Sequence, residues 1–234
     1  MTDSPPRPML ATDFTAAGEA KPEKVARPRD AATLLLWRRA GNGYEVLMGV
    51  RSAKHRFMPQ RLVFPGGRVD PEDRKAPALS ELEDHTRRAL ELRAAPRLAR
   101  AIGIAAAREL EEETGLLLGR MEAGRLQADL APMRYLCRAL TPAMSPVRFN
   151  ARFLMAPAEA VTGMMGGSGE LEHLGWYKVG ETPPHELAQI TGRVLREFAA
   201  VMELPEAERA TRPLIWYQGR DTRRLERMSP RSPG

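Results

Sequence analysis

Two short apolar segments near the start of the chain limit the folds that it can adopt. Residues 31–37 read AATLLLW and residues 44–51 read YEVLMGVR, with Gly41-Asn42-Gly43 between them. Two apolar runs of strand length, joined by a turn of glycine and asparagine, predict a β-hairpin. Residues 97–114 instead repeat their apolar positions at helical spacing, which predicts a helix ending at Gly115. Strands and helices therefore occur together, which excludes a purely helical or purely β fold.

The rest of the chain continues this mixture. Strands are predicted at 62–67, 133–140, 148–156 and 173–179, and further helices at 79–94 and 184–203. The last of these helices starts at a proline, a residue favoured in the first helical turn. Short strands interspersed with helices predict an α/β (α+β) fold, in which helices sandwich a mixed β-sheet.

Length and composition indicate one domain with a tail at each end. The chain has 234 residues, of which 43% are hydrophobic, enough for a sizeable core. Residues 1–30 are Pro-rich and predicted to be a flexible leader, 31–204 the domain, and 205–234 a basic tail. An apolar stretch at 213–218, PLIWYQ, predicts that this tail is partly packed on the domain.

Charge and cysteine content restrict the partners and the compartment. The formal net charge is +6, which favours anionic partners without specifying one. The single cysteine, Cys137, excludes a disulfide within the chain and is typical of a cytoplasmic protein. No apolar run has the length of a membrane span, and no RNA-binding motif accompanies the positive charge. Neither a membrane nor a nucleic acid is therefore an expected partner.

The sequence RELEEETG at 108–115 gathers carboxylates at the end of a predicted helix. Residues three and four positions apart share a helix face, so Glu109, Glu112 and Glu113 form one set. Carboxylates this close raise one another's pKa and destabilise the helix unless positive charge lies beside them. Mg²⁺ or Mn²⁺, which prefer oxygen ligands, would supply that charge. A solvated acidic helix face is the alternative explanation.

The run RELEEETGL at 108–116 resembles the second half of the Nudix box, whose pattern is R-E-apolar-x-E-E-x-G-apolar. Gly67, followed six residues later by Asp73, resembles the first half, with aspartate where glutamate is usual. No metal role is assigned to this aspartate. The spacing differs, because 34 residues, 74–107, lie where the ordinary box has seven. The resemblance implies a Nudix-type α/β/α sandwich.

A long insertion at this point is similar to that of the coenzyme A diphosphatase branch of Nudix enzymes. The flanking segments RSAKHRFMPQRLVFPGGRVDPED at 51–73 and TPAMSPVRFNARFLMA at 141–156 also resemble that branch. The likeness extends over about 31–180 and implies a helical insertion at about 74–100. The insertion would either cap the site or support a homodimer, and both roles stay open.

The resemblance also implies roles for the box residues. Glu109, Glu112 and Glu113 would bind Mg²⁺ or Mn²⁺ together with the carbonyl of Gly66, which makes Glu112 a catalytic residue. Arg108, grouped with the catalytic residues, would hold the helix in place by pairing with a nearby carboxylate. The arginine would not touch the substrate.

Residues outside the box would complete the site. Family members often take a general base from a later loop, and Glu170 is the candidate here, with Glu172 second. The alternative is that both are surface charges. A basic loop at 51–61 suggests binding of a substrate phosphate, and a solvated loop is the competing explanation. The residues predicted to contact substrate are Arg51, Lys54, Arg56, Arg61 and Gly67.

These features together predict a metal-dependent Nudix pyrophosphohydrolase of the bacterial cytoplasm. The favoured substrate is coenzyme A or acyl-CoA, cleaved to 3′,5′-ADP and (acyl)phosphopantetheine. A hydrolase of ADP-ribose, NADH or another nucleoside diphosphate derivative is the alternative within enzymes. The alternative of another class is a non-catalytic, nucleotide-sensing regulatory domain, and the intact set of box glutamates argues against it.

Overall fold

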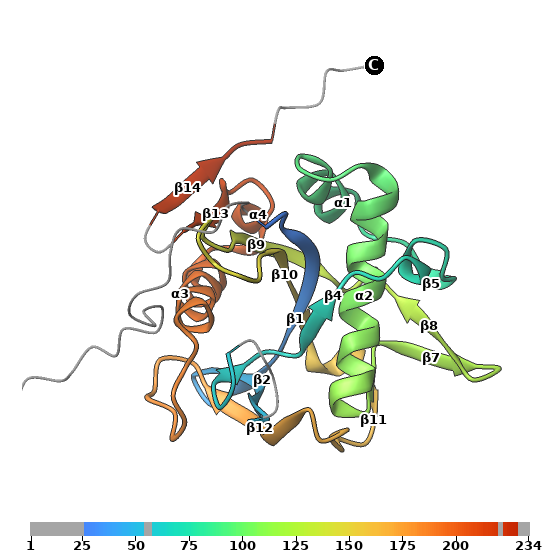
Figure 1. Cartoon of the computed structure of the whole chain (residues 1–234), viewed down its shortest axis with the longest axis horizontal. Helices are drawn as coiled ribbons and strands as arrows, with labels where there is room; N and C mark the ends of the chain where they lie inside the picture. Colours follow the sequence, from blue (N-terminus) through green and yellow to red (C-terminus); the bar gives the residue numbers. More distant parts are fainter. Residues whose placement is uncertain (1–25, 54–57, 220–221, 229–234) are drawn as a thin grey trace, which may run out of the picture.

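The main element of the protein is a nine-stranded sheet (Figure 1). The computed structural model describes residues 26–53, 58–219 and 222–228, so most of the predicted leader lies outside the described residues. In spatial order the main path of the sheet consists of β12 (Leu171–Lys178), β2 (Gly43–Arg51), β1 (Arg29–Ala40), β10 (Phe149–Pro157), β9 (Arg134–Leu140), β13 (Leu214–Gln218) and β14 (Thr222–Glu226). Two short strands join it, with β3 (Leu62–Val63) beside β2 and β4 (Gly66–Arg68) beside β1.

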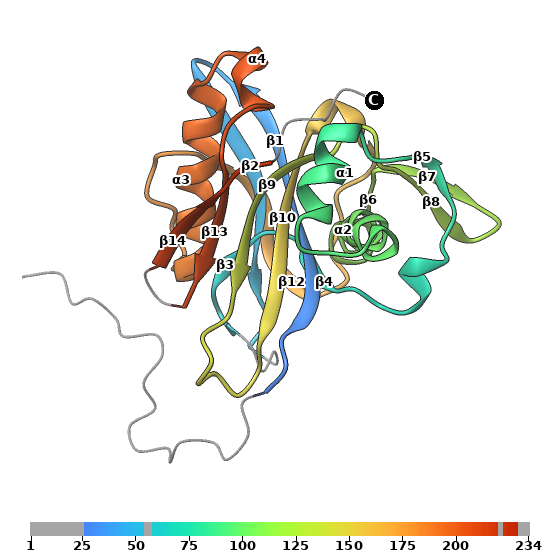
Figure 2. The ribbon, with the colours of Figure 1, turned by 90° about the horizontal axis from the view of Figure 1, so that it is seen from above.

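The sheet is mixed, as predicted. Strand β1 runs parallel to β10, and β9 runs parallel to β13, whereas the other pairs are antiparallel. Figure 2 shows helix α2 (Pro96–Thr114) on one face and helix α3 (Gln189–Glu203) on the other. The predicted sandwich is therefore confirmed. The remaining helical elements are η1 (Glu72–Arg74), α1 (Asp84–Glu91), η2 (Ala158–Ala160) and α4 (Glu206–Arg209).

The residues of strand β1 suit a sheet that is covered on both faces. Its side chains alternate between the faces, so Leu34 packs in the core on the α2 side, and Leu35 packs with Phe198 of α3. Both leucines are fully buried. A strand covered on both faces needs apolar residues at consecutive positions, and LLLW supplies them.

Several predicted elements are confirmed, and two are wrong in extent. The hairpin of β1 and β2 forms, and α2 ends at Gly115, whose φ of 72° is left-handed. The predicted helix at 79–94 is instead strand β5 (Ala78–Ser80) followed by α1, because Ala78 pairs with Ala128 of another strand. The predicted helix at 184–203 begins only at Gln189. Its first residues pair with Leu62 as extended backbone, which prevents helical hydrogen bonds there.

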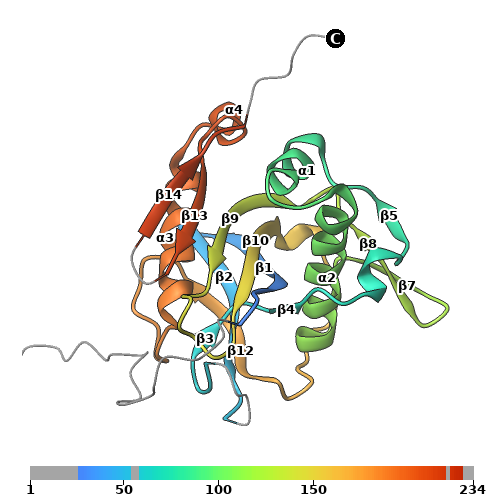
Figure 3. The same cartoon turned by 45° about the horizontal axis from the view of Figure 1, so that its top comes forward.

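Residues 74–107 separate the segment from Gly67 to Asp73 from the glutamate-rich segment at 108–116. They contain β5, α1 and about the first three turns of α2, so the segment is not wholly helical as predicted. In Figure 3, β5 lies with β7 (Gly119–Glu122) and β8 (Arg125–Asp129) on the far side of α2 from the main sheet. A two-stranded pair, β6 (Leu116–Leu117) with β11 (Thr162–Gly163), follows the end of α2.

The predicted C-terminal tail contributes directly to the sheet. Its described part contains α4, β13 and β14, and the Ile215 and Tyr217 side chains of β13 are buried. The sheet therefore continues past residue 204, where the domain was predicted to end. None of the described helices is long and apolar enough to cross a membrane.

Candidate active site

The C-terminal end of α2 carries the predicted carboxylates against the strand β4. Glu113 is 2% exposed, and its Oε2 accepts a hydrogen bond of 2.8 Å from the backbone N–H of Gly66. Glu109 lies over Gly67, where an added Cβ would be 2.3 Å from the Glu109 Oε1. An added Cβ at Gly66 would lie 2.6 Å from the carbonyl oxygen of Ala32 in β1. Gly67 therefore lets the helix and its carboxylate approach β4 closely, and Gly66 lets β4 lie close against β1.

Arg108 is surrounded by carboxylates. Its Nε and Nη2 each donate to Asp73, both at 3.0 Å, and its Nη1 donates to Glu109 and Glu112, both at 2.9 Å. Asp73 is 2% exposed and also accepts from the N–H of Asp70 at 2.7 Å. The expected pairing of Arg108 with nearby carboxylates is therefore present. The two-point contact with Asp73 ties the loop after β4 to the helix.

Sequence reasoning missed this anchoring role of Asp73. Its only signal was the position six residues after Gly67, where the resembled motif has a glutamate. Burial disfavours the charge on Arg108, but hydrogen bonding to Asp73 and the charges of Asp73 and Glu109 raise the pKa of the guanidinium. Arg108 is therefore held firmly in the charged state.

The carboxylates of α2 carry more negative charge than Arg108 can balance. Burial raises the pKa of Glu113 to about 8, and the neighbouring charges of Glu109 and Glu170 add to this rise. Burial also raises the pKa of Glu109, with further contributions from Glu112 and Glu170. Arg51, the Gly66 N–H and Arg108 oppose these shifts without cancelling them. The site consequently favours a bound cation.

The residues present suit a hard divalent cation. The glutamates at 109, 112, 113 and 170 are oxygen donors that line one pocket, as does Gly66. Within the described residues, no three His, Cys, Asp or Glu side chains are already arranged to hold a metal ion. Glu109 and Glu112 point to Arg108 instead. Their carboxylates would have to turn from this arginine to share a cation.

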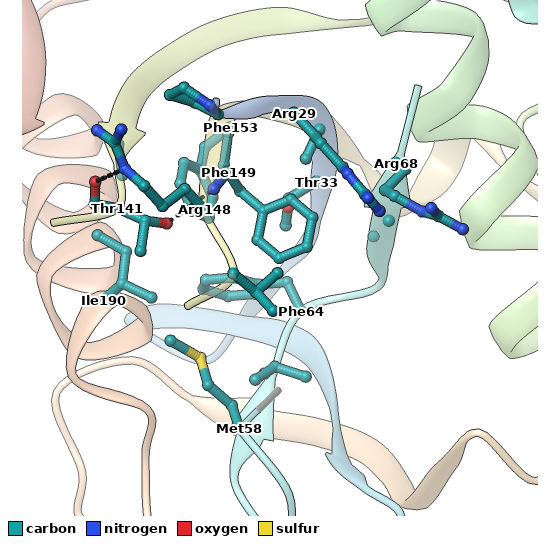
Figure 4. Close-up of a pocket in the computed structure, with 18 of the residues that line it drawn as sticks. Arg29, Thr33, Met58, Phe64, Arg68, Thr141, Arg148, Phe149, Phe153 and Ile190 are labelled. Carbon is teal, nitrogen blue, oxygen red and sulfur yellow. Dashed lines mark hydrogen bonds between the residues drawn. The ribbon is translucent and has the colours of Figure 1, made fainter. Parts of the chain in front are cut away.

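The pocket beside the carboxylates has a volume of about 1110 Å³ and crosses from β4 to the α3 face of the sheet. A row of alanines in register, Ala31 on β1, Ala151 on β10 and Ala139 on β9, forms part of its lining. Small side chains at one level of three adjacent strands leave this hollow. Larger apolar groups surround it, including Phe64, Phe149 and Ile190 (Figure 4). The pocket therefore has a carboxylate end and an apolar compartment.

The predicted substrate-binding residues are distributed unevenly around this pocket. Gly67 and Arg51 line it, and Arg51 Nη2 donates to the carbonyl of Gly66 at 3.0 Å. Arg61 is outside the described lining and pairs with Glu186. Lys54 and Arg56 lie outside the described residues.

The two candidates for the general base also differ in position. Glu170 lines the pocket, and its charge acts on Glu109 and Glu113. Glu172 is exposed on β12, opposite Val50 of β2, and is not among the described lining residues. Of the two, only Glu170 is therefore placed to serve the described pocket.

The likeness of this chain to known proteins lies in its structure. Neither a protein-family model nor a curated protein matches the sequence. A Nudix hydrolase from Alicyclobacillus acidocaldarius matches the structure with a TM-score of 0.56 and 24% identity, over 76% of this chain and 93% of that one. A MutT protein from Methanosarcina mazei Go1 gives 0.48 and 16%, over 77% and 100%. A MutT Nudix hydrolase from Burkholderia pseudomallei gives 0.46 and 22%, over 74% and 98%. The first likeness shows that this chain has the Nudix fold.

Proposed function

We propose that this protein is a metal-dependent Nudix pyrophosphohydrolase, which cleaves a diphosphate linkage in a nucleoside diphosphate derivative. The observation that carries the proposal is the set of carboxylates that α2 presents to one large pocket, with Glu170 at the same pocket. This arrangement on a Nudix fold suits hydrolysis of an anhydride between phosphates. A bound Mg²⁺ or Mn²⁺ would neutralise the diphosphate, polarise the phosphorus under attack and activate a water.

Each group of the site has a proposed task. Glu109, Glu112 and Glu113, with the carbonyl of Gly66, would hold the cation. Arg108 acts as a positioning residue, because its contacts with Asp73 fix the helix against the loop after β4. Glu170 would accept the proton of the attacking water, which its place on the pocket supports.

Coenzyme A or an acyl-CoA is the substrate that we favour, giving 3′,5′-ADP and (acyl)phosphopantetheine. The support comes from the segments at 51–73 and 141–156, which resemble the coenzyme A diphosphatase branch. The pocket adds to this support, because it combines an apolar compartment with a charged end and is large for a small-molecule site. A homodimer in the bacterial cytoplasm stays a prediction. Residues 74–107 are absent from the described lining of the pocket, and this absence argues against a capping role for the segment.

A product assay tests the proposal. The purified protein is incubated in the presence of Mg²⁺ or Mn²⁺ with one substrate at a time. The substrates are coenzyme A, acyl-CoA, ADP-ribose, NADH and diadenosine polyphosphates. Products are identified by mass. Fastest release of 3′,5′-ADP from coenzyme A or an acyl-CoA supports the proposal in full. Faster cleavage of ADP-ribose or NADH keeps the hydrolase and rejects the favoured substrate. Binding of these ligands without any cleavage supports the regulatory domain instead.

A further inference from the structure

The arginines that line the pocket differ in their contacts. Arg193 lies over the ring of Tyr217, and Arg27 is exposed just before β1. Arg108 pairs with carboxylates, Arg51 donates to the Gly66 carbonyl, and Arg148 donates to two backbone carbonyls. Arg29 and Arg68 also line the pocket, but neither guanidinium has a hydrogen bond or an ion pair with another described residue. Both are exposed. These two cations are therefore available to a ligand.

Strand pairing brings the two arginines together. Arg68 on β4 is directly opposite Ala31 on β1, so their side chains share a face of the sheet. Arg29 lies two residues before Ala31 and points to that same face. Diagonal neighbours of this kind lie roughly 7–8 Å apart, within reach of two arginine side chains. Figure 4 shows Arg29 and Arg68 side by side at one end of the labelled set.

The pair stands between the two parts of the pocket. On one side, Arg68 follows Gly66 and Gly67, which pack against the α2 carboxylates. On the other side, Arg29 is opposite Phe149 of β10, which borders the apolar compartment. A ligand that reaches from the carboxylates into that compartment along β4 and β1 would lie beside these guanidinium groups. The two guanidinium groups favour an anionic ligand, because each can donate charge-assisted hydrogen bonds to its oxygens. Asp70, which also lines the pocket, lies 4.0 Å from Arg108.

We infer that Arg29 and Arg68 form a clamp for the 5′-phosphate of a nucleotide whose base lies in the apolar compartment. The inference rests on the proposed function for the site of cleavage, because the bond to be cut would lie at the α2 carboxylates. The phosphate on the nucleoside side then lies next along the ligand, between the carboxylates and the base. Two guanidinium groups suit this position, since each can donate two parallel hydrogen bonds to phosphate oxygens.

Calorimetric titration with 5′-AMP, 3′-AMP and adenosine, in buffer containing EDTA, tests the clamp without any hydrolysis. The wild type should bind 5′-AMP more tightly than adenosine. Arg29→Gln and Arg68→Gln should each weaken 5′-AMP binding about tenfold, through the loss of charge-assisted hydrogen bonds, and leave adenosine binding unchanged. Arg97→Gln is the matched control. This exposed arginine of α2 is outside the described lining, and its loss changes the net charge equally.

Three results would overturn the clamp. They are equal binding of 5′-AMP and adenosine by the wild type, an unchanged affinity for 5′-AMP in the double variant, and a larger loss for 3′-AMP than for 5′-AMP. Turnover of coenzyme A by the wild type, measured separately, keeps the two proposals distinct. If turnover is normal but replacing both arginines leaves the affinity for 5′-AMP unchanged, the clamp is rejected and the hydrolase is kept. Binding that needs both arginines, without turnover of any substrate, rejects the hydrolase alone.

Discussion

Two networks in this protein both pair glutamate with arginine, and they differ in the balance between negative and positive charge. On α3, Glu197 is 7% exposed and accepts hydrogen bonds from Tyr217 at 2.6 Å and from Arg223 Nε at 2.7 Å. In this α3 network, one carboxylate is paired with one arginine. On α2, Arg108 serves Asp73, Glu109 and Glu112, and the buried Glu113 lies on the same helix. Both networks attach a helix to a distant segment of the chain.

The pKa shifts record this difference. Burial raises the pKa of Glu197, but hydrogen bonds from Arg223 and Tyr217 outweigh it, and the net shift is downward. The net shifts of Glu109 and Glu113 are upward, because burial and neighbouring carboxylates prevail. A balanced network thus stabilises the ionised carboxylate, whereas a surplus of carboxylates opposes it. We conclude that the α3 network serves the fold and that the α2 network is suited to bind a cation.

The largest expected effect comes from Glu112→Gln, which tests the binding role of the α2 network. Turnover should fall about a thousandfold, because a cation would lose a charged ligand worth several kcal/mol in the transition state. Stability should change little, since the Glu112 side chain is 52% exposed. Steady-state kinetics and thermal melting measure both. Glu111→Gln is the control, because this neighbour is outside the described pocket lining. Equal turnover of the two variants would reject the assignment.

Asp73→Ala removes the anchor of Arg108 and should have the next largest effect. The unfolding free energy should drop by about 3 kcal/mol, because the arginine keeps its charge and loses its two-point partner in a largely buried site. Denaturant titration measures the change. The exposed neighbour Glu72 gives the control Glu72→Ala, expected within about 0.5 kcal/mol of wild type. If both variants were equally stable, Asp73 would not be an anchor.

Elements whose signals are local were predicted well from the sequence. The hairpin at 31–51 and the helix ending at Gly115 depend on nearby turn residues and on spacing along the chain. Strand β5 was mistaken for part of a helix, because its conformation depends on pairing with β8, about fifty residues away. The start of α3 was placed too early because Leu62, far upstream, holds its preceding residues in extended form.

The same distinction applies to the site. The carboxylate set on α2 follows from helical spacing within five residues, so the sequence predicted which glutamates share a face. Arg29 and Arg68 were not singled out, because they meet only when β4 pairs with β1. The anchoring of Arg108 by Asp73 likewise depends on how the chain returns after 34 intervening residues. Spacing along the chain predicts which residues of one helix share a face. Which residues of different helices and strands meet depends on the tertiary fold.

A divalent cation should stabilise the protein through the carboxylates of α2 and not through the α3 network. Mn²⁺ or Mg²⁺ at a hundredfold excess over its dissociation constant should add about 2.7 kcal/mol to the unfolding free energy, and EDTA should reverse the gain. Thermal melting with and without the cation measures this. Glu109→Gln should lose most of the gain, whereas Glu197→Gln, in the balanced network, should keep it. A gain that survives Glu109→Gln would place cation binding elsewhere and break the comparison.

The smallest effect, Glu197→Gln, tests the structural role of the α3 network through its pH dependence. The folded pKa of Glu197 is lowered, so its contribution to stability is present above the unfolded value of about 4.3 and is lost as pH falls through the folded pKa. The variant should be about 1 kcal/mol less stable than wild type at pH 7, and this difference should shrink below about pH 4.3. Denaturant titrations at several pH values measure it. Glu203→Gln, exposed on the same helix, should match wild type throughout. A difference that stays constant down to the acid limit of folding would mean that Glu197 acts through packing rather than through its charge.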